Sequence, residues 1–582
     1  MSHPDSLPQV GTSKDGGALA LSVVPPCQGG AISDEVLEPE TVPAWLAGFQ
    51  SGTATIIDVR PILTAGREPI AEVLAAAEGM PQEGGLILLA PFNPGPLRSL
   101  LHERGMATYG RRQGERLWNI RVVRVAKSPS ASRGNGPALA RSSVGSTLKL
   151  GGATQRLLPE VIPLRFFGVA LVAHALAWAG LVVFAEAFPG FRGGAGPVLG
   201  VLHLTVLGVF LATAMGASFQ MLPVAFALPP PARWPCDLAF ALLVAGGAGL
   251  IIGFGLSEPG PMVGGALMLG GAVTLHAVAL ARLVYVPGDN SLLRWHIGAA
   301  LAAIACAVLL ALGLAADFRL GWLENHQDVA LAHFILAGFG FMGMFVLGFS
   351  QILIPMFSVA EPAGERLGQA AFVLATLGIL SAVVGVLAEG RVLLIVGVLA
   401  GFGAALCHIG QMMRTLRGRM RTRLGPEFLL IRLAWLFFPV SLGLALLIVL
   451  DIGMDLVPTL FGFTLIFGWY LTFLLGVLQR ILPFLASMHA VRFGAKALSP
   501  AKLTTPELLV VHQWCHLSAL VCVGAGLILA NIWLIRLGGL VGFVGAASFI
   551  AFGLDVLKKT KAHIATTASL KTAAPGRSVV DG

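Results

Sequence analysis

The sequence predicts a mostly α-helical protein: a polytopic membrane bundle of about twelve spans with a pseudo-threefold repeat, plus a small N-terminal two-layer α/β domain. Three observations lead to this fold class. Of the 582 residues, 56% are apolar and only 12% are charged, whereas about a quarter of a soluble domain is charged. Apolar runs of membrane-spanning length follow one another from residue 164 to residue 557. One motif recurs in every fourth run. This composition excludes a soluble globule, a disordered chain and a disulfide scaffold.

The N-terminal part divides into two segments. Residues 1–40 are polar and rich in Gly and Pro, which predicts disorder. Residues 41–126 alternate strand-like and helical patterns in the order β-α-β-α-β-β, which is typical of a two-layer α/β domain. The expected strands are 53–59, 86–90, 106–111 and 116–125, and the expected helices are 68–79 and 96–104.

The rest of the chain is a linker, a membrane domain and a tail. Residues 127–160 are rich in Ser, Gly and Arg and are expected to form a flexible linker. Residues 161–557 form the membrane domain, and residues 558–582 form a basic cytoplasmic tail. The expected spans are 164–188, 198–226, 237–257, 262–285, 294–316, 329–357, 368–388, 391–413, 429–450, 456–486, 507–531 and 532–556.

The basic charge follows the membrane topology. The net charge is +9, but no nucleic-acid partner is expected. If the N-terminal domain is cytoplasmic, the loops on its side hold 14 Lys and Arg residues and the opposite loops hold 4. Because cytoplasmic loops are enriched in basic residues, we expect both termini in the cytoplasm, a bacterial inner membrane as the location, and membrane lipid as a partner.

Spans two, six and ten end in one pattern, in which Pro follows Gly by seven residues with a Gln between them. The pattern consists of Gly216, Gln220 and Pro223; of Gly348, Gln351 and Pro355; and of Gly476, Gln479 and Pro483. Spans four, eight and twelve show an echo, because His276, His408 and Asp555 each precede a basic residue by six. The spacing indicates three groups of four spans. The alternative is that these are generic helix ends with small packing residues.

Eight of the 13 histidines lie in or beside the spans, where ionisable groups are costly and indicate function. His203 and His333 sit near the outer ends of spans two and six. Two imidazoles at similar depth can bind haem iron or copper. The alternative is that each hydrogen-bonds a neighbouring helix.

A second histidine set lies in the inner halves of the spans. His512 and His516 are four residues apart and share one helix face, a spacing that suits a metal. His276 and His408 are candidates to complete this inner metal site. The alternative is that these side chains only pack or face water.

The segment with His203, Gly208, Gly216 and Pro223 reads H-x4-G-x7-G-x6-P. It resembles the ligand-bearing helices of subunit I of the haem–copper oxidase superfamily, especially cbb3-type oxidases and nitric oxide reductases. The resemblance covers residues 164–557. It implies that His203 corresponds to a low-spin haem ligand and His333 to a copper ligand.

The chain departs from that superfamily at two positions. Span seven has no histidine, and Phe463 stands where span ten of those enzymes has a haem ligand. A complete dinuclear oxygen-reducing centre is therefore not expected. The chain looks more like divergent relatives typified by NnrS, a haem- and copper-containing membrane protein linked to nitrogen-oxide metabolism.

The N-terminal domain resembles the TusA/SirA-like domain of unknown function 2249, through Asp58-Val-Arg-Pro and Gly66-Arg-Glu-Pro. Sulfur transfer is excluded within it, because it contains no cysteine between Cys27 and Cys236. Its most distinctive charges are Asp58, Arg60, Arg67 and Glu68. They form either a surface for a partner or ligand, or a salt-bridged pair of loops.

Together these features predict an integral membrane protein that binds haem or copper and serves respiration or nitrogen-oxide metabolism. If it is an enzyme, it is expected to be an oxidoreductase. Two other functions stay open. One is a non-redox transporter or a metal- or haem-handling protein built on the same bundle. The other is a membrane sensor or scaffold whose soluble domain docks a cytoplasmic protein.

Overall fold

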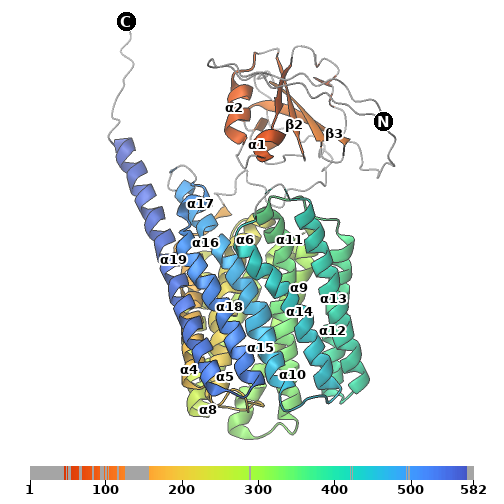
Figure 1. Cartoon of the computed structure of the whole chain (residues 1–582), viewed down its shortest axis with the longest axis vertical. Coiled ribbons are helices and arrows are strands. Elements are labelled where there is room, and N and C mark those ends of the chain that lie inside the picture. The colour runs from red at the N-terminus through yellow and green to blue at the C-terminus, as the bar shows by residue number, and fades with distance from the viewer. Residues whose placement is uncertain are drawn as a thin grey trace, which may run out of the picture.

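The computed structural model describes most of the membrane domain and the elements of the N-terminal domain (Figure 1). The described residues are 43, 45, 46, 49, 54–64, 69–81, 84–91, 97–98, 101–102, 104–114, 117–124, 156–286, 290–419, 421, 424–492, 495 and 498–572. The predictions of disorder at 1–40 and of a flexible linker at 127–160 fall almost wholly outside these residues.

The N-terminal domain contains a four-stranded sheet with the order β1-β2-β4-β3. The strands are β1 (Thr55–Asp58), β2 (Gly85–Ala90), β3 (Met106–Gly114) and β4 (Leu117–Arg124). β1 pairs with β2 in parallel, and the other two pairs are antiparallel. A parallel pair needs a crossover, which here contains α1 (Arg60–Thr64) and α2 (Ile70–Glu78).

A small apolar core holds this domain together. Val73 and Ala77 of α2 are fully buried in one cluster with Leu86 and Leu88 of β2. Residues 97–98 and 101–102 are helical, inside the second helix that the sequence predicts. The predicted α/β domain is therefore confirmed, with the short helix α1 as an addition.

Twelve helices in the described part of the chain are long and apolar enough to cross a membrane. Nine are single helices: α4 (Val161–Val183), α7 (Arg233–Leu256), α8 (Pro259–Tyr285), α9 (Ser291–Leu320), α12 (Arg366–Leu387), α13 (Arg391–Arg417), α14 (Glu427–Val449), α18 (Pro506–Ile528) and α19 (Ile532–Thr572). The short helix α17 (Pro500–Leu503) precedes α18.

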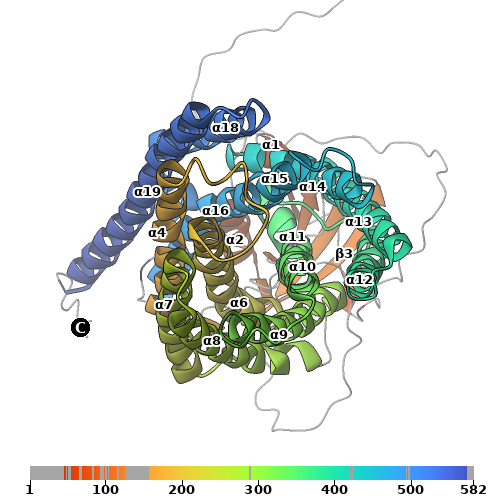
Figure 2. The ribbon, with the colours of Figure 1, turned by 90° about the horizontal axis from the view of Figure 1, so that it is seen from below.

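The other three spans each contain a π-helical segment. They are α5 (Pro197–His203), η3 (Leu204–Leu211) and α6 (Ala212–Ala225); α10 (His326–Ile335), η4 (Leu336–Gly343) and α11 (Met344–Ser358); and α15 (Val457–Phe463), η5 (Thr464–Leu471) and α16 (Thr472–Arg492). The π segments begin 132 and 128 residues apart, the spacing of Gly216, Gly348 and Gly476. Figure 2 shows α6, α11 and α16 inside a ring of the other helices. The threefold repeat is therefore present in the backbone.

Three helix hairpins on the outside of the bundle repeat the same turn. The pairs α7–α8, α12–α13 and α18–α19 pack along their length. Each turn contains one left-handed residue, at Ser257, Glu389 and Ala530. In each, the next backbone N–H donates to the carbonyl five residues earlier, which is the helix-ending Schellman pattern. Equivalent positions of the hairpins are thus 132 and 141 residues apart.

This register corrects one detail of the sequence repeat. Counting 141 residues from His408 leads to Phe549, not to Asp555. The aligned basic residues of spans four, eight and twelve therefore do not mark equivalent positions in the third hairpin, because the chain between the second and third hairpins is longer.

Candidate functional site

The helices α5 and α10, which contain His203 and His333, lie near the end of the bundle opposite the one at which α19 carries the tail (Figure 1). We call this the distal end; it includes the loop at residues 321–325. His203 is the last residue of α5, directly before η3, and His333 lies in α10, three residues before η4. Both side chains are half-buried. The two imidazoles are near enough to each other that a charge on one would act on the other.

Hydrogen bonds orient both rings in the same way. Nδ1 of His203 lies 3.0 Å from the carbonyl oxygen of Leu199, and Nδ1 of His333 lies 2.8 Å from that of Ala307. Because a carbonyl only accepts, each Nδ1 carries the proton and donates it. Each Nε2 therefore keeps its lone pair. This is the state in which a histidine binds a metal.

The two histidines are not equivalent members of the repeat. Gly208 and Gly340 each face an alanine on the first helix of their group, and these contacts align position 203 with Ile335. His333 is thus two positions out of register with His203. The pair is therefore not related by the pseudo-symmetry, and its similar depth stays a prediction.

A series of ring contacts leads from His203 to His326, which pairs with an acidic side chain. Phe254 packs against His203 at a tilt of 48° with ring centroids 4.7 Å apart, and the ring of Phe318 lies 6.3 Å from that of Phe254. The His326 ring lies 5.3 Å from Phe318, and its Nδ1 is 2.6 Å from a carboxylate oxygen of Asp317. The sequence analysis missed Asp317 and His326, which flank the distal loop.

A second group of histidines lies in the bundle interior. His174 of α4 and His512 of α18 have ring centroids 6.0 Å apart, and His512 and His516 are 6.3 Å apart. All three are at most 2% exposed. The sequence analysis expected the His512–His516 pair but missed His174. The available signal was Trp178, four residues after His174 on the same span, because a buried indole N–H needs an acceptor.

The partners of His174 and His512 settle where their protons lie. Trp178 donates its indole N–H to Nε2 of His174 at 3.0 Å, so Nδ1 of His174 carries the proton. The side-chain amide of Gln479 donates to Nδ1 of His512 at 2.9 Å, so Nε2 of His512 carries the proton. Gln513 in turn donates to the amide oxygen of Gln479 at 2.9 Å, which supports this orientation.

In His516 the ring nitrogen without a protein partner is an acceptor, whereas in His174 and His512 it is a donor. The hydroxyl of Thr472 donates to the carbonyl oxygen of Phe467 at 2.8 Å, so Nε2 of His516 donates to Thr472 at 2.9 Å. Its Nδ1 is then an acceptor. Within the described part of the chain, Nδ1 of His174, Nε2 of His512 and Nδ1 of His516 have no protein partner. The cluster offers two donors and one acceptor, which suits hydrogen-bonded water better than a metal ion.

The remaining candidate ligands lie elsewhere in the bundle. His276 of α8 lies 2.8 Å from the hydroxyl of Ser218 and packs edge-on against Phe219. His408 of α13 is buried and lies in the neighbourhood of His296 of α9. Among the described residues, no group of three or more His, Cys, Asp or Glu side chains is arranged to hold a metal ion. An inner metal at His512, His516, His408 and His276 stays a prediction, and it would require the hydrogen bonds of His512 to rearrange.

In the N-terminal domain, Asp58 and Arg60 form a bidentate ion pair with a shortest distance of 2.6 Å. Asp58 also accepts the backbone N–H of Arg60 at 3.0 Å and so ties the end of β1 to α1. The side-chain hydrogen bonds from Arg60 lower the pKa of Asp58 from its ordinary value. Arg67 and Glu68 lie outside the described residues, and a partner surface at these four positions stays a prediction.

Comparison with known proteins bears on the N-terminal domain. Residues 56–124 match a family described as "Uncharacterized conserved protein (DUF2249)". The match covers the sheet from β1 to β4 and agrees with the resemblance found in the sequence. No curated protein matches the chain. The fold and site thus define a membrane helix bundle with buried histidines, joined to a DUF2249 domain.

Proposed function

We propose that the protein binds a copper ion within the membrane through Nε2 of His203 and Nε2 of His333. The observation that carries the proposal is the shared anchoring of the two rings. Each Nδ1–H is held by a backbone carbonyl, at 3.0 and 2.8 Å, which leaves both Nε2 lone pairs available. Metal-ligating histidines are oriented by this kind of hydrogen bond.

The charge of the surroundings favours copper. Two neutral imidazoles do not neutralise the charge of a divalent cation. The nearby carboxylate of Asp317 is already paired with His326. The cost of burying an ion rises steeply with its charge. Monovalent copper is therefore the least costly of the metals that imidazole binds. A bound copper ion would supply one-electron chemistry between its two oxidation states.

Haem is less well supported at the described residues. A porphyrin needs a cavity beside its ligand. The bundle contains an apolar cavity of about 450 Å³, but none of the described residues that line it is a histidine. Haem is therefore the alternative that the experiment below distinguishes from copper.

The sequence resemblance to haem–copper oxidases supports a role in respiration or nitrogen-oxide metabolism. Phe463 in span ten and the absence of histidine from span seven argue against an oxygen-reducing dinuclear centre. We infer an electron-transfer or ligand-binding role for the pair, with oxidoreductase activity as the form an enzyme would take.

The test is metal analysis of the purified full-length protein together with its optical spectrum. We expect one copper per chain in the wild type and a loss of copper in His203→Ala and in His333→Ala. His296→Ala is the matched control, because Nδ1 of His296 also lies 2.8 Å from a backbone carbonyl oxygen, that of Leu292, but His296 lies near the start of α9, at the end opposite the distal loop. Copper that survives both substitutions would refute the assignment. A Soret band that disappears with the same substitutions would replace copper with haem.

A further inference from the structure

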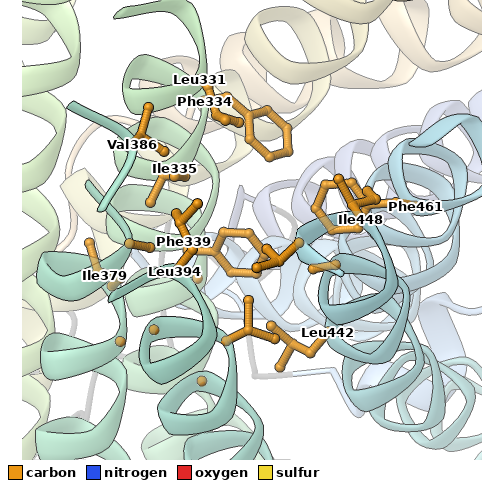
Figure 3. A pocket seen from close by; sticks show the side chains of 18 of the residues that line it. Leu331, Phe334, Ile335, Phe339, Ile379, Val386, Leu394, Leu442, Ile448 and Phe461 are labelled. Carbon is orange, nitrogen blue, oxygen red and sulfur yellow. The ribbon is translucent and has the colours of Figure 1, made fainter. Parts of the chain in front are cut away.

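A long apolar cavity of about 450 Å³ lies between the second and third groups of helices. Figure 3 shows labelled side chains that face it from both sides, and all their atoms are carbon. They are Leu331, Phe334, Ile335 and Phe339 of α10 and η4; Ile379 and Val386 of α12; Leu394 of α13; Leu442 and Ile448 of α14; and Phe461 of α15. An apolar space of this kind stays free of water and takes apolar guests.

The lining of the cavity is about as long as one hydrocarbon chain. Its lining runs from Arg391 to Ala404 on α13 and from Phe438 to Val449 on α14. At a rise of 1.5 Å per residue these stretches are about 16 to 20 Å long. An extended hydrocarbon chain can follow this apolar lining from end to end.

The pseudo-symmetry relates this space to a second one that aromatic side chains fill. The equivalent space between the third and first groups holds the cluster of Trp178, His174 and His516. Gly401 faces Leu442, and its counterpart Gly542 faces Trp178. Leu442 thus stands where the other site has Trp178.

The same register pairs two further positions of the cavity with the cluster. Phe438 stands where the cluster has His174, and Ala375 stands where it has His516. Leu442 and Ala375 are smaller than Trp178 and His516, whereas Phe438 is larger than His174, so two of the three positions provide less side-chain volume than in the cluster.

An ion pair stands at the distal end of the cavity. Arg391 begins α13 and Asp451 follows α14, and their side chains are 3.1 Å apart and 55% and 70% exposed. Both also line the cavity. A cation beside an anion complements a zwitterionic group, since a phosphate can pair with Arg391 while an ammonium pairs with Asp451.

We propose that this cavity holds one acyl chain of a zwitterionic phospholipid, phosphatidylethanolamine, with its head group at Arg391 and Asp451. The second acyl chain lies in the surrounding bilayer. The lipid fills a space that would otherwise lack packing contacts, and it joins the second and third groups of helices. The assignment does not depend on copper at His203 and His333.

The test measures lipid that stays with the purified protein. Wild type, Leu442→Trp, Ala375→Leu and Leu436→Trp are extracted from the same membranes in mild detergent, and phosphatidylethanolamine per chain is measured by mass spectrometry. Leu442→Trp copies the filled site, and Ala375→Leu blocks the channel from α12. Leu436 is the matched control, because it lies on α14 but is 61% exposed to the lipid side.

We expect one tightly held phosphatidylethanolamine in the wild type and in Leu436→Trp. In the two blocking variants the retained lipid falls at least about fivefold, or about 1 kcal/mol in binding. Ala375→Leu decides the outcome if Leu442→Trp does not elute as a folded species. Equal lipid in all four proteins would overturn the proposal. An isoprenoid quinone that is lost from the blocking variants in place of the phospholipid would overturn the assigned occupant.

The head-group assignment has its own measurement. Asp451→Asn leaves Arg391 without its anion, so the variant should shift its preference toward anionic phosphatidylglycerol in vesicles that contain both lipids. An unchanged ratio of the two bound lipids would show that the ion pair does not hold the head group.

Discussion

Gly542 and Gly401 are pseudo-symmetric positions with different neighbours, so the same substitution at both should change the stability of the protein differently. Gly542 contacts Trp178. A Cβ added at Gly542 would lie 2.6 Å from Cε2 of Trp178, well inside van der Waals distance. The indole cannot withdraw, because its ring lies between Phe467 at 5.2 Å and His516 at 6.1 Å and is fully buried. Gly542→Ala is therefore an overpacking substitution.

The expected magnitude follows from two opposing effects. Overpacking a core costs about 1–3 kcal/mol, and replacing a helical glycine by alanine returns up to about 1 kcal/mol. Gly542→Ala should thus reduce the free energy of unfolding by about 1–2 kcal/mol. Gly401→Ala is the matched control, since its Cβ would lie 3.4 Å from Leu442, an ordinary contact beside the cavity. That substitution should be neutral or slightly stabilising.

The assay is the apparent unfolding temperature of each purified variant at one fixed heating rate, because large membrane proteins commonly unfold irreversibly. Gly542→Ala should unfold below the wild type, and Gly401→Ala should unfold at or above it. Equal shifts in the two variants would refute the reasoning, since the two glycines would then have equivalent surroundings.

Two further predictions concern single hydrogen bonds. Thr472→Val removes the acceptor of His516 and should cost about 1–3 kcal/mol, seen as a lower unfolding temperature; Thr464→Val, whose hydroxyl bonds only to carbonyls of its own helix, should change it little. Asp58→Asn should destabilise the N-terminal domain by less than about 1 kcal/mol, because the Asp58–Arg60 pair is partly exposed. Because the pKa of Asp58 is lowered, this difference should be present above its ordinary value of 3.8 and vanish as the pH falls through the lowered value. Thermal unfolding at pH 7 and at acidic pH would check it, and a difference that grew on acidification would contradict it.

The strands and spans could be predicted because each is a local pattern. The strand expected at 86–90 is β2, and the span expected at 507–531 is α18, which ends at Ile528. Turn chemistry was harder to predict. The helix α1 is only five residues long, and its start depends on the Asp58 side chain. The π-helical segments had no signal in the sequence, although they recur at the spacing that the motif predicted.

The candidate sites also combine features that the sequence could predict with features that it could not. His203 and His333 could be selected as candidates from the sequence, because imidazoles are rare and costly in membrane spans, and their joint role stays a prediction. Their anchoring could not be predicted, since the acceptor of His333 is Ala307 on another helix. His174 was missed as a partner of His512 because α4 and α18 are separated by more than 300 residues in the chain.

The sequence by itself determined the membrane class, the number of spans, the N-terminal α/β domain and the threefold period. These follow from hydrophobicity and short-range spacing, which act along the chain. Only the tertiary structure decided which histidines meet, which of their nitrogens keep a lone pair, and that the space between the second and third groups of helices is left open while its counterpart between the third and first groups is filled. Those outcomes depend on side chains from distant helices competing for the same volume and the same hydrogen bonds, and that competition exists only after the helices have packed.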